Sequence, residues 1–135
     1  MILNFSFQIE SHVNTAKDSD LSIVRCYGIT KDPETNNFMM VMEYAQCGSL
    51  RQHLNNSFNS LNWDNKIYNL ICIAAGLRAI HKKGLIHQDL HSGNVLNNKR
   101  ANPLYSLITD LGFCKPANVE PSQNNGKQIY GVLQF

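Results

Sequence analysis

The sequence predicts an α+β fold, in which a β-hairpin is followed by a long helix and a further short strand. Two runs rich in β-branched, aromatic and apolar residues, 22–30 and 37–45, flank a turn segment that contains Pro33, which favours an antiparallel hairpin. Within 63–83, apolar side chains recur every three or four residues, which is the spacing of a helix. A short apolar run at 106–113 leads into a glycine turn and is typical of a buried strand.

The remaining segments give weaker signals. Residues 2–13 alternate as a strand would and also carry a helical stripe, so both conformations stay open. A short helical segment is expected around 49–55, after a glycine break. Asn62 is the expected N-cap of the long helix, and Gly84 is its expected terminator after two lysines in the last turn. Segment 115–128 contains two prolines and five side-chain amides and reads as a mobile loop.

Length and composition fit one domain of ordinary charge. The 135 residues are 43% hydrophobic, which is enough for a modest core. The formal net charge is +2 without a basic tract, so nothing favours binding to nucleic acid or to a membrane surface. The start does not resemble a signal peptide, and no apolar run approaches the ~20 residues that span a bilayer, so a cytoplasmic location is expected. The four cysteines form no C-x-x-C pair, which indicates reduced, packed thiols.

The segment "GLIHQDLHSGNVL", residues 84–96, gathers two histidines, an acid and an amide in one loop. Its residue types are compatible with a metal site, a phosphoryl-transfer site or a polar turn without chemistry. His87, Asp89 and His91 alternate, so they would share a face in an extended segment and could bind zinc. Zinc sites usually take three or four ligands, and a further ligand would have to be found elsewhere.

Four motifs resemble those of protein kinases, and they occur along the chain in the same order as in that family. The pattern H-x-D-L-x-x-x-N, which contains Asp89 and Asn94, and the D-L-G that begins at Asp110 are similar to the kinase catalytic loop and metal-binding turn. "FMMVMEYAQCGSL" resembles the strand, hinge and helix start that line a kinase adenine pocket. "VRCYGI" resembles the strand before that hinge, and "LRAIHKKG" resembles the end of the long helix that enters the catalytic loop. The match covers roughly residues 5–135 and is most similar to the tyrosine-kinase-like branch.

The resemblance implies an incomplete kinase-like fold. It places a small-lobe remnant in 1–42, a hinge in 43–48, and the first half of the helical large lobe, with catalytic loop and activation segment, in 49–135. The sequence contains no G-x-G-x-x-G and no V-A-I-K-like strand, and the resemblance would place both before residue 1. Gln88 stands where many kinases carry an arginine that binds a phosphorylated activation-loop residue.

The resemblance also implies the residues that handle phosphate and metal. Asp89 would accept or orient the proton of the attacking hydroxyl. Asp110 would hold the Mg²⁺ that bridges the β- and γ-phosphates, and Asn94 would offer its amide oxygen to a second Mg²⁺. His87 would pack beneath Leu111 in the buried stack that supports this arrangement.

Four further residues are implied to bind the adenine end of ATP. Met42 would be the gatekeeper at the back of the pocket. Backbone groups of Glu43 and Ala45 would meet the adenine edge, and Leu96 would pack under the ring. ATP and Mg²⁺ are therefore the implied cofactors.

The implied function is transfer of the γ-phosphoryl group of ATP to a Ser/Thr or Tyr hydroxyl of a protein substrate in signalling. The alternative is a catalytically inactive kinase-like module that binds a nucleotide or a protein. Ile71, Leu77 and Ile80 are expected to lie on one exposed apolar face of the long helix, which a partner would cover.

Overall fold

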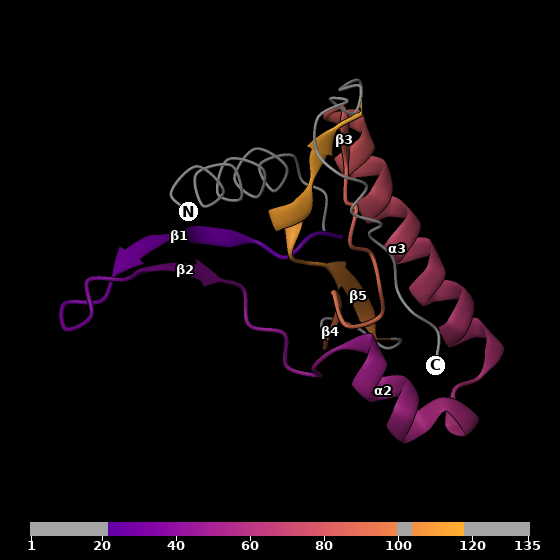
Figure 1. The fold of residues 1–135 in the computed structure, drawn as a ribbon. Coiled ribbons are helices and arrows are strands. Elements are labelled where there is room, and N and C mark those ends of the chain that lie inside the picture. The colour runs from indigo at the N-terminus through magenta and orange to yellow at the C-terminus, as the bar shows by residue number, and fades with distance from the viewer. Residues whose placement is uncertain (1–21, 100–103, 118–135) are drawn as a thin grey trace, which may run out of the picture.

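We analysed a computed structural model that describes residues 22–99 and 104–117. A two-stranded hairpin, β1 (Cys26–Lys31) and β2 (Phe38–Met42), projects away from the long helix α3 (Trp63–Lys82) (Figure 1). The order of the elements between and after these is α2 (Leu50–Ser57), a 3-10 turn (Phe58–Ser60), β3 (Leu85–Ile86), β4 (Val95–Asn98), β5 (Tyr105–Ile108), a 3-10 turn (Leu111–Phe113) and β6 (Lys115–Pro116). The open prediction for 2–13 lies outside the described residues, as does most of 115–128.

The predicted hairpin is confirmed, although its first strand begins later than the apolar run does. β1 and β2 pair antiparallel, with Ile29 opposite Met40. The preceding residues do not extend the hairpin: Ile23 forms a parallel bridge with Ile108, and Val24 N–H donates to Ile108 O at 2.9 Å. Both Ile23 and Val24 are buried, so this short stretch belongs to the core of the helical part and the hairpin begins where burial ends.

The two predicted helices are also confirmed, with their caps. The side chain of Asn62 accepts from Asn65 N–H at 2.8 Å and starts α3. Gly84, at φ +69°, ends it in the left-handed conformation that favours glycine. α2 begins with a capping box between Ser49 and Gln52 and runs on to Ser57, slightly beyond the expected segment 49–55.

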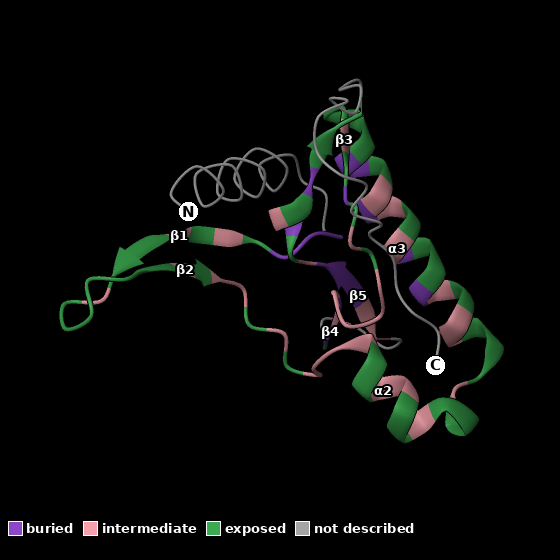
Figure 2. Cartoon of the chain, viewed as in Figure 1, coloured by how far each residue is buried: buried purple, intermediate pink, exposed green. Residues whose placement is uncertain are grey.

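The core lies between β5 and one side of α3 (Figure 2). Its buried members are Ile23, Ala79, Ile80, Ile108, Leu111 and Cys114. Gly76 allows the close approach of the helix, because a Cβ at this position would stand 2.8 Å from Ser22 O and 2.9 Å from Ile108 Cδ1. α3 therefore holds β5, and with it the turn that follows β5.

One prediction about α3 is wrong. Ile71 is 59% exposed, but Ile80 is fully buried and Leu77 packs against the core, so these three residues do not share an exposed face. Nine residues are two and a half helical turns, which puts Ile71 and Ile80 on opposite sides. The large apolar side chains that α3 does expose lie in its first half: Trp63, Ile67, Leu70 and Ile71.

Strand β4 was not expected, because half of its residues are polar. It pairs antiparallel with β5, and Asn97 and Asn98 are buried. The hydroxyl of Ser106 lies 3.0 Å from Asn97 Oδ1 and 3.2 Å from Asn69 Oδ1, so polar side chains join β4, β5 and α3 inside the protein. Within the described part of the chain, no helix is long and apolar enough to cross a membrane.

Candidate active site

The candidate site is formed where the loop before β4 meets the turn after β5. The pairing of Val95 with Ile108 places Asn94 opposite Thr109, and Thr109 N–H donates to Asn94 O at 3.0 Å. Asp110 is the next residue. The strand register thus brings two residues that lie 16 positions apart in the sequence to one edge of a small sheet.

His87 connects the turn after β5 to Asp89, the acid of the loop before β4. Its side chain is 2% exposed; Nε2 lies 2.9 Å from Thr109 O, and Nδ1 lies 3.3 Å from the N–H of Asp89. Because Nδ1 accepts a hydrogen bond from a backbone amide, Nε2 carries the ring proton and donates a hydrogen bond to the carbonyl oxygen. Both ring nitrogens are therefore used within the protein. Leu111, beneath which His87 was expected to pack, is fully buried as well.

Asn94 closes the connection. Its Nδ2 donates to the backbone oxygen of Asp89 at 3.0 Å and to Asp89 Oδ2 at 3.2 Å. Hydrogen bonds thus run in a circuit from Asp89 to His87, to Thr109, to Asn94 and back to Asp89. With both amide hydrogens of Asn94 turned toward Asp89, the amide oxygen has no donor among the described residues and is available to a cation.

Asp110 adopts a backbone conformation that is uncommon for aspartate. Its φ and ψ are 58° and 62°, and the residue is exposed, while Leu111 beside it is fully buried. Left-handed non-glycine residues cost free energy and are concentrated at functional sites. The buried Leu111 fixes the turn, so the carboxylate of Asp110 is presented to solvent at the edge where Asn94 lies.

The described residues fit a magnesium site better than a zinc site. No three His, Cys, Asp or Glu side chains among them gather to hold a metal ion, and His87 is committed to Thr109 and Asp89. Mg²⁺ prefers oxygen ligands and is often held by one or two protein groups, with water and phosphate oxygens completing its shell. The carboxylate of Asp110 and the amide oxygen of Asn94 meet that requirement.

Cys114 reports on the electrostatics of this turn. Burial, and secondarily the nearby carboxylate of Asp110, raises the pKa of its thiol from 9.0 to about 11. The folded protein therefore holds the thiol proton more tightly than the unfolded chain, so the contribution of Cys114 to stability is constant below about pH 9 and falls as the pH rises from about 9 to about 11.

We expect the stability difference between the natural protein and Cys114→Ala to shrink over this pH interval. Urea unfolding of both proteins at about pH 8 and about pH 10 measures this difference in unfolding free energy. The contributions of the other titrating groups cancel when the two proteins are compared. A difference that stayed constant would show that the thiol does not titrate as described.

The predicted adenine-binding residues lie at the end of β2, in the expected hinge segment 43–48, and in β4. Met42 is the last residue of β2 and is half-buried. Glu43 N–H donates to Arg25 O at 2.8 Å, and Glu43 Oε1 accepts from Asn98 Nδ2 at 3.0 Å. No described residue accepts the N–H of Ala45.

Leu96 links this hinge to the loop that carries Asp89. It forms an antiparallel bridge with Ser49, while Asn97 exchanges backbone hydrogen bonds with Cys47 and Gly48. Leu96 is two residues after Asn94, which is about 7 Å along a strand. The structure thus brings Asp89, Asn94 and Asp110 to one end of β4, and it places segment 47–48 beside this strand, which contains Leu96.

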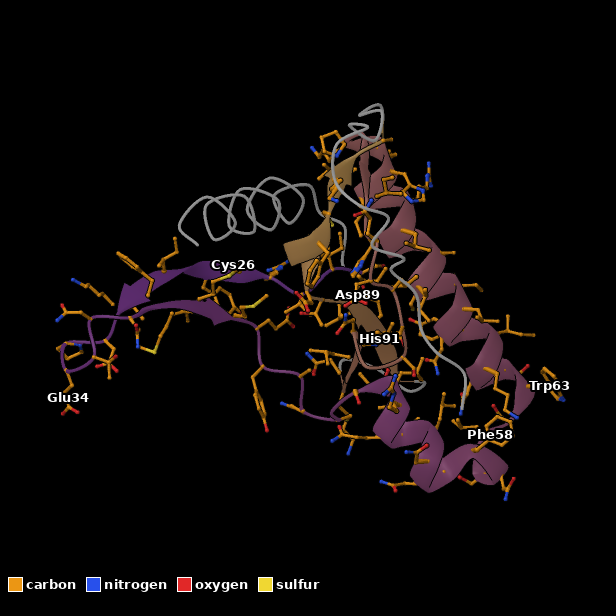
Figure 3. The ribbon with its side chains drawn as sticks, in the orientation of Figure 1. Cys26, Glu34, Phe58, Trp63, Asp89 and His91 are labelled. Carbon is orange, nitrogen blue, oxygen red and sulfur yellow. The ribbon has the colours of Figure 1, made fainter. Side chains whose placement is uncertain are left out.

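The sequence indicated His91 only as a possible zinc ligand, whereas the structure places its ring against Asp89 (Figure 3). Its Nδ1 accepts from the backbone N–H groups of Gly93 and Asn94 at 3.0 and 3.2 Å, and its Nε2 lies 3.8 Å from Asp89 Oδ2. The only signal in the sequence was the short spacing in H-S-G-N, which is too small a pattern to indicate a side-chain cap.

Comparisons with known proteins identify the family. Residues 6–131 match the family model described as protein tyrosine and serine/threonine kinase. The chain therefore belongs to the protein kinase family, and the predicted kinase-like α+β fold is confirmed.

Its curated relatives include several serine/threonine kinases. The chain is 41% identical over 99 residues to serine/threonine-protein kinase CLA4 of Candida albicans, covering 72% of this chain and 10% of that protein. It is 31% identical over 103 residues to the G-type lectin S-receptor-like serine/threonine-protein kinase SRK of Arabidopsis thaliana, covering 72% and 12%. It is 27% identical over 125 residues to Kinase suppressor of Ras B of Caenorhabditis elegans, covering 90% and 21%. The chain thus spans only a tenth to a fifth of the length of these relatives.

Proposed function

We propose that this chain binds ATP with Mg²⁺ and takes part in transfer of the γ-phosphoryl group to a serine or threonine hydroxyl of a protein substrate in the cytoplasm. The observation that carries the proposal is the hydrogen-bond circuit through Asp89, His87, Thr109 and Asn94. It holds one acid and one amide at the edge of the sheet where the second acid, Asp110, begins the next turn. The names of the relatives favour serine or threonine as acceptor.

Each residue has a distinct task in this proposal. Bound Mg²⁺ would neutralise the negative charge that develops on the phosphate oxygens. Asp110 and Asn94 offer it a carboxylate and an amide oxygen, which are hard ligands of the kind Mg²⁺ prefers. Asp89 accepts or orients the proton of the attacking hydroxyl, because its Oδ1 has no donor among the described residues and its Oδ2 is held by Asn94.

The nucleotide would lie along β4, with its phosphates at the Asn94 end. The backbone N–H of Ala45 would donate to the adenine edge, and Leu96 would lie under the ring. Glu43 would contact adenine through its carbonyl, because its N–H already donates to Arg25. Met42, immediately before the hinge, would limit the depth of the pocket.

A second candidate is a kinase-like module that binds nucleotide or protein without transfer. The observation in its favour is that the 135 residues contain neither a G-x-G-x-x-G loop nor a V-A-I-K lysine, two features that hold ATP phosphates in kinases. A module of this kind that binds nucleotide would use the same residues, so it differs from the first candidate at the transfer step. A module that binds only protein differs already at the binding step.

Binding of ATP should require Mg²⁺ and Asp110. We expect Asp110→Asn to weaken Mg²⁺-dependent ATP binding about tenfold or more, since a contact to a charged group contributes about 1.5–3 kcal/mol and about 1.4 kcal/mol is a factor of ten. Titration calorimetry with ATP, in the presence of Mg²⁺ and then of a chelator, measures this affinity.

Asp64→Asn is the matched control, because Asp64 is an exposed acid in the first turn of α3 and the substitution removes the same charge. It should bind ATP as the natural protein does. If the natural protein binds no ATP, or if Asp110→Asn binds it equally well, the proposed site is wrong.

A further inference from the structure

His91 forms a side-chain cap over the turn that carries Asn94. The backbone makes the turn itself, since Asn94 N–H donates to His91 O at 2.9 Å. The ring then folds back over it, and Nδ1 accepts from Gly93 N–H at 3.0 Å and from Asn94 N–H at 3.2 Å. The imidazole Nδ1 thus accepts backbone hydrogen bonds in the way that an Asp or Asn side-chain oxygen does in an Asx turn.

The cap requires glycine at position 93. A Cβ on Gly93 would stand 2.8 Å from Cε1 and 2.9 Å from Nδ1 of His91, so the ring lies against the backbone where any other residue would carry its side chain. The turn is also tied to α2, because Arg51 N–H donates to Ser92 O at 3.0 Å and the Arg51 side chain reaches Ser92 Oγ at 3.5 Å. The position of the ring is thus fixed by the backbone at Gly93 and by the contacts of the turn with α2.

This fixed ring determines which nitrogen faces Asp89. Since Nδ1 accepts two backbone N–H groups, the ring proton is on Nε2. Nε2 lies 3.8 Å from Asp89 Oδ2, the same oxygen to which Asn94 Nδ2 donates at 3.2 Å. The guanidinium of Arg51 is the other charged group near the turn. Two N–H dipoles therefore stand on one side of the carboxylate of Asp89, and Oδ1 is left on the other side.

We propose that His91 is a positioning residue, which holds the carboxylate of Asp89 with Oδ2 toward the loop and Oδ1 toward the incoming hydroxyl. The inference rests on the proposed function, because it assigns Oδ1 as the oxygen that receives the hydroxyl proton. It adds that the ring acts in two separable ways: Nδ1 caps the turn and Nε2 orients the acid.

Two variants separate these actions. His91→Asn keeps an acceptor close to the position of Nδ1 but removes the group that reaches Asp89. His91→Gln keeps an N–H close to the position of Nε2 but loses the acceptor of the cap. If His91 orients Asp89, His91→Asn should retain the thermal stability of the natural protein but shift the carboxyl carbon resonance of Asp89. His91→Gln should do the reverse: it should lower the thermal stability and leave that resonance near its original position.

NMR of the full chain, labelled with ¹³C and ¹⁵N, reads out both effects without any need for turnover. The long-range ¹H–¹⁵N spectrum of the natural protein should show His91 protonated at Nε2 alone. In phosphoryl transfer to a generic protein acceptor, His91→Asn should lower kcat about 10–100-fold and leave the KM for ATP unchanged, as expected when a residue that orients a reacting group is lost.

An unshifted Asp89 resonance in His91→Asn, or protonation of His91 at Nδ1, would overturn the positioning role. The outcome could also be mixed: the natural protein shows the Nε2 tautomer and His91→Asn shifts the Asp89 resonance, but the natural protein transfers no phosphoryl group. That result would support the geometry around His91 and contradict the proposed transferase function. The two failures are therefore distinguishable.

Discussion

Replacing Ile80 by alanine should lower the free energy of unfolding by about 2–5 kcal/mol, whereas Ile71→Ala should change it by no more than about 0.5 kcal/mol. The same substitution is made in the same helix, and only the side of the helix differs. Ile80 is fully buried in the cluster that includes Ile108 and Leu111, whereas Ile71 is 59% exposed. Removal of three buried carbon atoms from Ile80 leaves a cavity in a small core.

Urea unfolding followed by circular dichroism measures both values. Because a domain of this size is stabilised by only about 5–15 kcal/mol, Ile80→Ala should remove a large fraction of the total. An Ile71→Ala variant that lost as much stability as Ile80→Ala would show that the outer side of α3 is packed in solution.

The effect of Ile80 should extend to the candidate site. Ile108 and Leu111 flank Thr109 and Asp110, so the core under α3 is also the floor of the turn that carries the second acid. A cavity at position 80 removes packing from both flanking residues at once. We infer that the geometry of the site depends on the same few buried side chains as the stability of the fold.

The hairpin and the long helix could be predicted because their signals are local. Two runs rich in β-branched, aromatic and apolar residues on either side of Pro33 indicate the hairpin, and Asn62 and Gly84 mark the ends of α3. Strand β4 could not be predicted in this way, since Asn97 and Asn98 give it a polar composition. They are buried all the same, and both use their side chains in hydrogen bonds to other elements, which is a tertiary property that hydropathy does not record.

The residues of the candidate site were proposed from the sequence, but the contacts between them could not be predicted. Asp89, Asn94 and Asp110 were identified by resemblance alone. The hydrogen bond from Thr109 to Asn94 follows from the register of β4 on β5, and the bond from His87 to Thr109 joins a third segment to this pair; no short motif encodes either contact. The error about Ile80 has a similar origin, because the apolar stretch 70–77 in the middle of α3 does not reveal which side of the helix the core will take.

Replacing Asp89 by asparagine should separate the two candidate functions. Asparagine has nearly the same shape, and its side-chain oxygen can still accept from Asn94 Nδ2, as Oδ2 of Asp89 does at 3.2 Å. The amide nitrogen would then occupy the place of Oδ1, where it can donate a hydrogen bond but cannot accept a proton. Binding of ATP with Mg²⁺ should therefore be retained, whereas phosphoryl transfer should fall about 10²–10⁴-fold, which is the usual contribution of a general base.

A radiolabelled-phosphate transfer assay run beside calorimetry decides between the candidates. Asp110→Asn should lose both binding and transfer, Asp89→Asn should lose transfer alone, and Asp64→Asn should lose neither. If the natural protein binds ATP but its transfer is no faster than that of Asp89→Asn, the carboxylate has no catalytic task and the non-catalytic module is the better description. If Asp89→Asn instead loses ATP binding, the acid serves the nucleotide or the loop structure, and the assignment of Oδ1 as proton acceptor fails with it.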